Sequence, residues 1–237
     1  MNEHKLASIG QLVAGIVHNL KNPLNVILGY AGLLKMDVPE AAEKCNQIIG
    51  AADNMTRIIQ NILDKSRDEQ SMEMKSLNLN KVLTDELNFL QADPFFKHRV
   101  EKVVELDESL PQIAGIYSDF SQSFSNIIRN ALDAMHKTDR KGLTVKGWYE
   151  NDYIFIKIED TGEGISEDNL KHIFEPYFST KPAICESKEG EPAGTGLGLF
   201  MVQTLLKKYN PEYDIRSRPG EGTSFIIKIP VQKRNTN

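Results

Sequence analysis

Two groups of residues in this 237-residue chain have types and spacings that can support chemistry. The first centres on His18, which lies in the stretch 17–24, VHNLKNPL. An unprotonated imidazole nitrogen is a nucleophile that is available near neutral pH. A single exposed histidine on a helix is usually just a solvated side chain, so His18 taken alone indicates no reaction.

The second group consists of two glycine-rich blocks. Residues 160–165, DTGEGI, follow an apolar strand, and residues 194–199, GTGLGL, precede a helix. Glycine lets the backbone approach a ligand closely, and the N-terminus of a helix favours phosphate. Asp160 at the strand end can accept a hydrogen bond from an exocyclic amine. Neither block is specific alone, because the second lacks the βαβ unit of a dinucleotide site and the lysine of a P-loop.

A third block supplies amides and a fourth supplies aromatic rings. Asn126 and Asn130 lie four residues apart and therefore share one face of a predicted helix. Hydrated Mg²⁺ with phosphate oxygens would satisfy them, although two surface asparagines are the commoner situation. Aromatic residues in 174–178, FEPYF, precede Lys181, and for Phe174 we expect simple core packing.

The histidine is predicted to lie on a long helix over residues 6–35. Apolar residues spaced three, four or seven apart predict one buried face. These residues are Ile9, Leu12, Ile16, Leu20, Leu24, Ile27, Ala31 and Leu34. His18 falls off this stripe and is predicted to face solvent. Pro23 would clash with the carbonyl of Asn19, so the helix is predicted to bend just after the histidine.

A second helix is predicted over residues 40–68, after a short break at 36–39 that places Pro39 in its first turn. Its apolar positions are spaced by four and three, as in a heptad seam. They are Ile48, Ala52, Met55, Ile59 and Ile62. Two such helices form an antiparallel hairpin that leaves much apolar surface in water. Pairing two hairpins in a four-helix bundle would bury it, so we expect a homodimer.

The rest of the chain mixes helices and strands without strict alternation, which predicts an α+β two-layer sandwich. Residues 68–76 are interpreted as a linker. Helices are predicted at 79–90, 118–136, 165–173 and 197–209, and strands at 100–106, 143–149, 153–160, 214–217 and 223–229. The irregular segment 178–194 is either a functional lid or disordered. These patterns predict two domains, residues 1–72 and 73–237.

Composition excludes some classes of function. Hydrophobic residues make up 40% and charged residues 26%, as in a soluble globular protein. A net charge of -5 argues against nucleic acid as the main partner. Cys45 and Cys185 are far apart and form no metal-binding spacing, which favours a reducing compartment. No apolar run is long enough to span a membrane. We therefore expect a cytoplasmic chain, either by itself or as the cytoplasmic part of a longer sensor.

The order and spacing of these blocks resemble a known family. The stretch 18–24 resembles the phosphoacceptor box of two-component sensor histidine kinases, most closely the nitrogen-regulation type. The blocks at 126–131, 160–164, 174–178 and 194–199 resemble the N, G1, F and G2 boxes of the ATP-binding domain shared with gyrase, Hsp90 and MutL. Gly220-x-Gly222-Thr223-x-Phe225 is similar to the final glycine box. The resemblance covers residues 8–230.

The resemblance implies roles for individual residues. His18 would be the phosphoacceptor in a dimerisation and phosphotransfer hairpin. Asp160 would bind the adenine amine with Thr223 beside the base. Asn130 would be the Mg²⁺ ligand and Asn126 would help to hold the triphosphate of ATP. The remaining nucleotide-binding candidates are Gly162 and Gly164 at the adenine pocket, Gly194, Gly196, Leu197 and Gly198 at the hinge of the lid, and Lys181, which could reach a phosphate.

The implied function is ATP-dependent autophosphorylation of His18, followed by transfer to an aspartate on a response-regulator receiver domain. One residue departs from the pattern: Asn19 stands where the family has an acid that accepts the proton of the imidazole ring. Asn22 fits the position that places water for receiver phosphatase activity. Two alternatives remain open, a degenerate kinase that only docks a receiver, and an ATPase switch like gyrase. Such ATPases usually carry a general-base glutamate where Asn126 stands.

Overall fold

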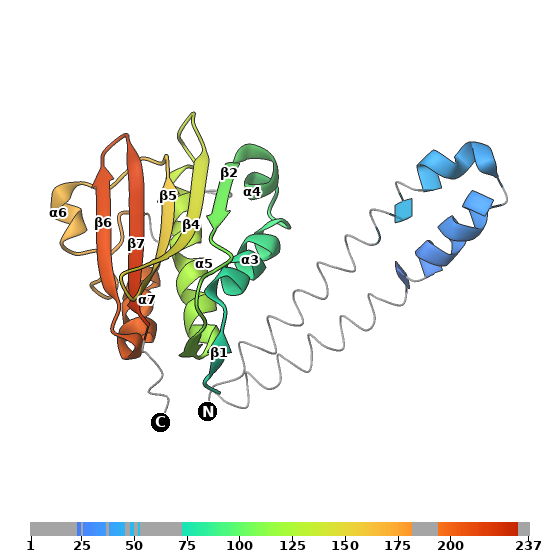
Figure 1. Ribbon diagram of the computed structural model, residues 1–237. Coiled ribbons are helices and arrows are strands. Elements are labelled where there is room, and N and C mark those ends of the chain that lie inside the picture. The colour runs from blue at the N-terminus through green and yellow to red at the C-terminus, as the bar shows by residue number, and fades with distance from the viewer. Residues whose placement is uncertain are drawn as a thin grey trace, which may run out of the picture. The chain divides into compact units, whose positions relative to one another are not determined.

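The computed structural model (Figure 1) describes residues 23–24, 26–36, 38–45, 48–49, 52, 73–181 and 194–231. The chain divides into two compact units, residues 1–71 and 72–237, and each is described by itself. His18, Asn19 and Asn22, together with the predicted bend after the histidine, lie outside the described residues. Within the described part of the chain, no helix is both long enough and apolar enough to cross a membrane.

The described part of the first unit is helical, as predicted. Helical residues run to position 36, and the 3-10 helix η1 (Pro39–Ala41) then opens a second helical stretch. Leu24 and Ala31 of the predicted stripe are buried, but Ile27 and Leu34 are each 46% exposed. Part of the predicted stripe is therefore uncovered in the single chain.

A second apolar stripe on the same helix was not predicted. Val26, Tyr30 and Leu33 are spaced four and three residues apart, so they share one helix face. Their side chains are 56%, 70% and 58% exposed. Large apolar side chains in such a row leave an uncovered surface on the single chain.

The second unit contains two sheets. The larger has the strand order β2-β4-β5-β7-β6, and the smaller pairs β1 with β3. Strands β2 and β4 are parallel, whereas all other pairs are antiparallel. The strands are β1 (Lys75–Leu77), β2 (Glu101–Leu106), β3 (Ile113–Gly115), β4 (Gly142–Glu150), β5 (Tyr153–Asp160), β6 (Glu212–Arg218) and β7 (Gly222–Pro230).

Helices α3 (Leu79–Leu90), α5 (Tyr117–Ala134) and α7 (Gly198–Leu206) lie on one face of the larger sheet (Figure 1). The short helix α6 (Glu167–Leu170) lies at the edge beside β6. The remaining helices of this unit are α4 (Pro94–Arg99) and the 3-10 helix η2 (Lys207–Tyr209). Strand β5 alternates buried and half-buried residues, which points Ile156 and Ile158 into the core. Phe120 and Phe124 of α5 lie in the same core. This arrangement confirms the predicted α+β class with its two-layer sandwich.

Most predicted elements of this unit agree with the structure to within three residues, but several predictions were wrong. The expected linker 68–76 contains β1, and α4 and β3 were not predicted. The helix expected over 165–173 is only the one-turn α6, followed by turns. Strand β2 does not alternate between buried and exposed side chains. It is an edge strand, and Val103 and Val104 are both about half exposed.

Candidate functional site

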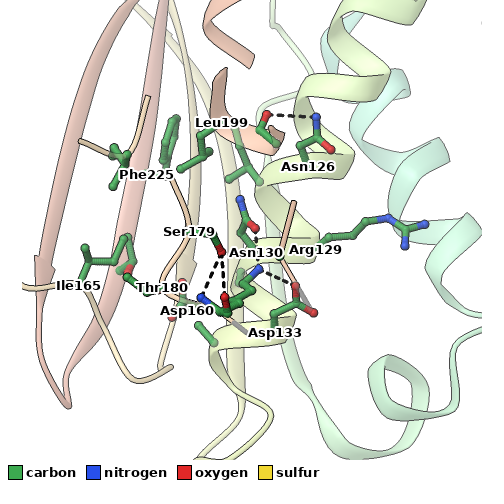
Figure 2. A pocket seen from close by; sticks show the side chains of 18 of the residues that line it. Asn126, Arg129, Asn130, Asp133, Asp160, Ile165, Ser179, Thr180, Leu199 and Phe225 are labelled. Atoms are coloured by element: carbon green, nitrogen blue, oxygen red, sulfur yellow. Dashed lines mark hydrogen bonds and ion pairs between the residues drawn. The ribbon is translucent and has the colours of Figure 1, made fainter. Parts of the chain in front are cut away.

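A cavity of about 340 Å³ opens between the sheet and helices α5 and α7. Its residues come from α5, the ends of β5 and β7, the start of α7 and the segment 178–181, which is described up to Lys181 (Figure 2). The apolar residues that line the cavity are Ile158, Ile165, Ile173, Leu199, Ile215 and Phe225, of which Ile165 and Phe225 lie on the side of the sheet (Figure 2). The opposite side carries amide, carboxylate and ammonium groups from Asn126, Asn130, Asp133 and Lys181.

Asp160 lies at the apolar side of the cavity, at the end of β5. Asp160 is only 7% exposed, and its carboxylate oxygen Oδ1 accepts a hydrogen bond of 2.7 Å from the backbone N–H of Gly162. Burial raises the pKa of this carboxyl to about 6, against the lowering effect of the backbone N–H groups of Gly162 and Thr223. Among the described residues no cation pairs with Asp160, so its buried carboxylate is suited to accept a hydrogen bond from a ligand.

Glycine is required beside Asp160 for steric reasons. Gly222 opens β7 with φ +102°, and a Cβ there would lie 2.0 Å from the backbone oxygen of Asp160. At Gly162 a Cβ would lie 2.6 Å from the Cβ of Ala134. These glycines allow β7 and the turn after β5 to close around the carboxylate. Thr223 pairs with Asp160 across the strands and lines the cavity.

Helix α7 presents its first turn to the polar side of the cavity. The side-chain amide of Asn126 donates a hydrogen bond of 3.2 Å to the carbonyl oxygen of Gly198, the first residue of α7. At the other end, the Tyr209 hydroxyl donates a hydrogen bond of 2.5 Å to Asp119 of α5. Contacts to α5 therefore hold α7 at both ends, which fixes the position of its N-terminal turn.

Asn130 and Asp133 lie on the same side of α5, three residues apart. The Lys181 ammonium donates to Asn130 Oδ1 at 2.8 Å and pairs with Asp133 Oδ2 at 2.6 Å (Figure 2). A positive charge thus already lies between an amide oxygen and a carboxylate oxygen. Such oxygens are also the protein ligands that Mg²⁺ prefers, so these residues fit a hydrated Mg²⁺ ion.

The segment before Lys181 meets the glycine block before α7. Tyr177 has φ +66°, and its backbone N–H donates a hydrogen bond of 2.9 Å to the carbonyl oxygen of Gly196. A Cβ on Gly196, which has φ +68°, would lie 2.3 Å from the carbonyl carbon of Tyr177. Only glycine fits this close approach. Residues 178–181 and 194–196 therefore lie side by side, with the undescribed segment 182–193 between them in the chain.

Nine of the residues predicted from sequence line this one cavity. They are Asn126, Asn130, Asp160, Gly164, Lys181, Gly194, Gly196, Gly198 and Thr223. Gly162 lies just behind Asp160, and Leu197 directly precedes α7 without lining the cavity. Phe174 packs against Tyr213 and Phe225, as expected for core packing. Sequence analysis missed Arg129 and Asp133, although both lie within three residues of Asn130 on α5.

Comparison with known proteins identifies two families along the chain. Residues 115–233 match the family described as histidine kinase-, DNA gyrase B- and HSP90-like ATPases. Residues 8–71 match the His Kinase A phospho-acceptor domain. The chain therefore belongs to the histidine kinases of this ATPase family. It combines the phospho-acceptor domain and the ATPase domain of that family in one chain.

The curated relatives are longer sensor kinases. The chain is 30% identical to the signal transduction histidine-protein kinase AtoS of Escherichia coli, over 96% of this chain and 36% of that protein. It is 30% identical to the sensor histidine kinase ZraS of Salmonella typhi, over 98% of this chain and 48% of that protein. Sporulation kinase E of Bacillus subtilis is 28% identical. The chain spans less than half the length of each of these relatives.

Solved structures share the fold. The mycobacterial sensor histidine kinase MprB aligns with a TM-score of 0.55 and 20% identity over 67% of this chain and 97% of that one. Full-length ShkA, solved in complex with AMPPNP, aligns with a TM-score of 0.55 and 20% identity over 93% of this chain and 45% of that one. At these identities the alignments establish the fold alone.

Proposed function

We propose that this chain binds ATP in the cavity, transfers its γ-phosphoryl group to His18, and passes that group to an aspartate of a response-regulator receiver domain. One observation carries the proposal. The cavity combines a buried carboxylate on its apolar side with amide oxygens, a cation and a helix N-terminus on its polar side. This arrangement complements a purine ring that carries an amine at one end and a triphosphate at the other.

The adenine ring would occupy the apolar side. Asp160 would accept a hydrogen bond from the exocyclic amine, and Thr223 would lie beside the base. Ile158 and Phe225 would contact the flat faces of the ring, while Gly162 and Gly164 leave it room. A site that hydrogen-bonds a buried polar group discriminates strongly against ligands that lack the partner.

The triphosphate would occupy the polar side, at the first turn of α7. Backbone N–H groups of the block 194–198, from Gly194 and Gly196 to Leu197 and Gly198, would face its oxygens, as favoured at helix N-termini. Asn130 would hold Mg²⁺, and Asn126 would support the same region by fixing α7. When bound, the metal ion neutralises charge on the phosphates. Lys181 supplies a further positive charge there.

In the transfer step, the unprotonated nitrogen of His18 attacks the γ-phosphorus. The bond to the bridging oxygen breaks, ADP leaves, and a nitrogen–phosphorus bond forms. The ring then gives up its other proton to water. Asn19 can orient the imidazole ring but cannot take this proton, so we propose slow autophosphorylation. Asn22, four residues after His18 in sequence, would position water against the phosphorylated receiver for phosphatase activity.

We propose that residues 1–72 carry out dimerisation and phosphotransfer and that residues 73–237 bind ATP. A homodimer would pair the uncovered apolar stripe Val26-Tyr30-Leu33 with that of a second copy. The reaction uses ATP and a receiver protein, so we propose that this part of the protein works in the cytoplasm. Asn19 favours one alternative function, a degenerate kinase that docks a receiver without phosphorylating it.

Nucleotide binding tests the proposed site directly. Asp160→Asn keeps the size of the side chain but turns an amide donor toward the adenine amine. Affinity for ATP with Mg²⁺ should fall at least tenfold, about the effect of one lost buried hydrogen bond. Glu159→Gln, on the neighbouring residue, serves as a control and should bind normally. An affinity within about twofold of the wild type would show that Asp160 does not hold the base.

A further inference from the structure

Lys181 lies where a metal ion would be expected in the proposed site. Its ammonium is 2.8 Å from Asn130 Oδ1 and 2.6 Å from Asp133 Oδ2. The contact joins residues 48 and 51 positions apart in sequence, from two different elements. The side chains of Lys181 and Asp133 are only 23% and 33% exposed. Both residues that anchor the ammonium line the cavity.

The ammonium of Lys181 would compete with a metal ion for the amide oxygen of Asn130. That oxygen is the group proposed to hold Mg²⁺, and it already accepts a hydrogen bond from Lys181. Two cations within a few ångströms of each other also repel strongly where the surroundings are partly buried. Lysine is a compact charge on a flexible stem, so its ammonium can move while its backbone stays in place.

We propose that Lys181 is a stand-in cation, held in the metal position by Asp133 and displaced from Asn130 when Mg²⁺ enters. The inference rests on the proposed function of the cavity. Without Mg²⁺, the ammonium supplies the positive charge that the triphosphate needs. With Mg²⁺, the ion takes over that role and Lys181 is no longer needed at Asn130. Nucleotide binding should therefore depend less on Mg²⁺ than in a site without the lysine.

Asp133 is a positioning residue in this account. It carries a negative charge on the phosphate side of the cavity, where it would by itself repel a triphosphate. Its benefit for binding comes entirely through Lys181, which it holds against Asn130. The effect of removing the carboxylate should therefore depend on whether the lysine is present.

The first test measures how nucleotide affinity depends on Mg²⁺. A fluorescent ATP analogue is titrated into the full chain, once with excess Mg²⁺ and once with EDTA. The ratio of the two dissociation constants, EDTA over Mg²⁺, should rise at least fivefold in Lys181→Met, about the effect of one charge-assisted contact. The rise should come from weaker binding in EDTA. Lys181→Arg keeps the charge and should stay near the wild-type ratio.

Lys171→Met is the matched control for the loss of one positive charge. Lys171 also pairs with an aspartate, Asp168 at 3.2 Å, but it is 63% exposed and does not line the cavity. The ratio of the two dissociation constants in Lys171→Met should equal that of the wild type. An unchanged ratio in Lys181→Met would overturn the inference, because the lysine would then contribute equally with and without the metal ion. If the wild type binds nucleotide in neither condition, the proposed function itself fails.

The second test is a double-substitution cycle in EDTA. Asp133→Asn should weaken binding when Lys181 is present, because the ammonium loses its anchor. In the Lys181→Met background, Asp133→Asn should strengthen binding, because only a repulsive charge is removed. This reversal of sign is a readout that a purely structural carboxylate would not give. An effect of the same sign in both backgrounds would overturn the role of Asp133.

Discussion

Asp160 shows how one residue can lower stability and still serve a binding site. The fold removes its carboxylate from water and offers it backbone N–H groups, and no cation among the described residues pairs with it. Burial without such a partner disfavours the charged form, which is why the pKa rises to about 6. An empty site therefore keeps a poorly solvated charge at neutral pH, and a ligand amine would relieve it.

The stability of the empty protein should reflect this raised pKa. Between about pH 4 and pH 6 the folded state binds a proton at Asp160 that the unfolded chain releases, so stability falls as pH rises through this window. The contribution is up to ~3 kcal/mol and is fully present only below about pH 4. Urea unfolding of the wild type and Asp160→Asn across this range measures the difference.

Asp160→Asn should not show this loss of stability with rising pH. Its stability relative to the wild type should therefore increase from pH 4 to pH 6 and then stay level. Comparing the two proteins cancels the contribution of other carboxyls, such as Asp107, whose pKa is lowered. A relative stability that does not change with pH would mean that Asp160 has an ordinary pKa in the folded state.

Residue types and order predicted most of the proposed site. Nine predicted residues line one cavity, because the glycine blocks and asparagines fall at the ends of elements that meet there. The Lys181–Asp133 pair was not predicted, since it joins residues 48 positions apart whose approach depends on the fold. His18 lies outside the described residues, so its exposure to solvent and its role as phosphoacceptor stay predictions.

At the scale of elements, apolar periodicity predicted the long helices and central strands well. Helix α3 has the predicted bounds Leu79–Leu90, because Asn78 caps its start and apolar residues repeat along one face. Short elements were missed. Strands β1 and β3 have three residues each, too few for a pattern, and they exist because they pair with each other. Helix α4 could have been found from its capping residue Asp93 and from Pro94.

The junction of β5 and β7 supports a prediction on glycine. Gly222→Ala places a methyl group 2.0 Å from the Asp160 carbonyl oxygen at φ +102°. Strain and the clash together should lower stability by at least ~3 kcal/mol. The clash should displace Asp160, and this displacement should also weaken nucleotide binding.

Gly220→Ala is the matched control for this substitution. Gly220 also has a positive φ, +81°, but a Cβ there meets nothing within 4 Å. Its cost should be the backbone strain alone, about 1–2 kcal/mol, with nucleotide affinity unchanged. Chemical unfolding and nucleotide titration measure both effects. Equal losses of stability in the two variants would show that close approach to Asp160 is not what requires glycine at position 222.

At the scale of the whole molecule, the uncovered helical surface predicts association between two copies. The stripe Val26-Tyr30-Leu33 is more than half exposed in the single chain. Burying it stabilises a dimer by roughly 25 cal/mol for each Å² of apolar area. Analytical ultracentrifugation should find a dimer in the wild type. Leu33→Glu should shift it toward monomer, because a charge would be buried in the interface.

Lys35→Glu introduces the same acid on the same helix, two residues away from the stripe, and should remain dimeric. A wild type that sediments as a monomer at micromolar concentration would contradict the proposed homodimer. A dimer that Leu33→Glu leaves intact would place the interface on another surface of the chain.

The central claim is that this chain phosphorylates its own His18. The most direct measurement incubates the chain with γ-labelled ATP and Mg²⁺ and follows protein-bound label, its acid lability, and free phosphate. The account predicts acid-labile label that is absent in His18→Ala. The label should form faster in Asn19→Glu, by up to the 10²- to 10⁴-fold that is typical of general-base assistance. Acid-stable label, label that persists in His18→Ala, or release of free phosphate alone would contradict the account.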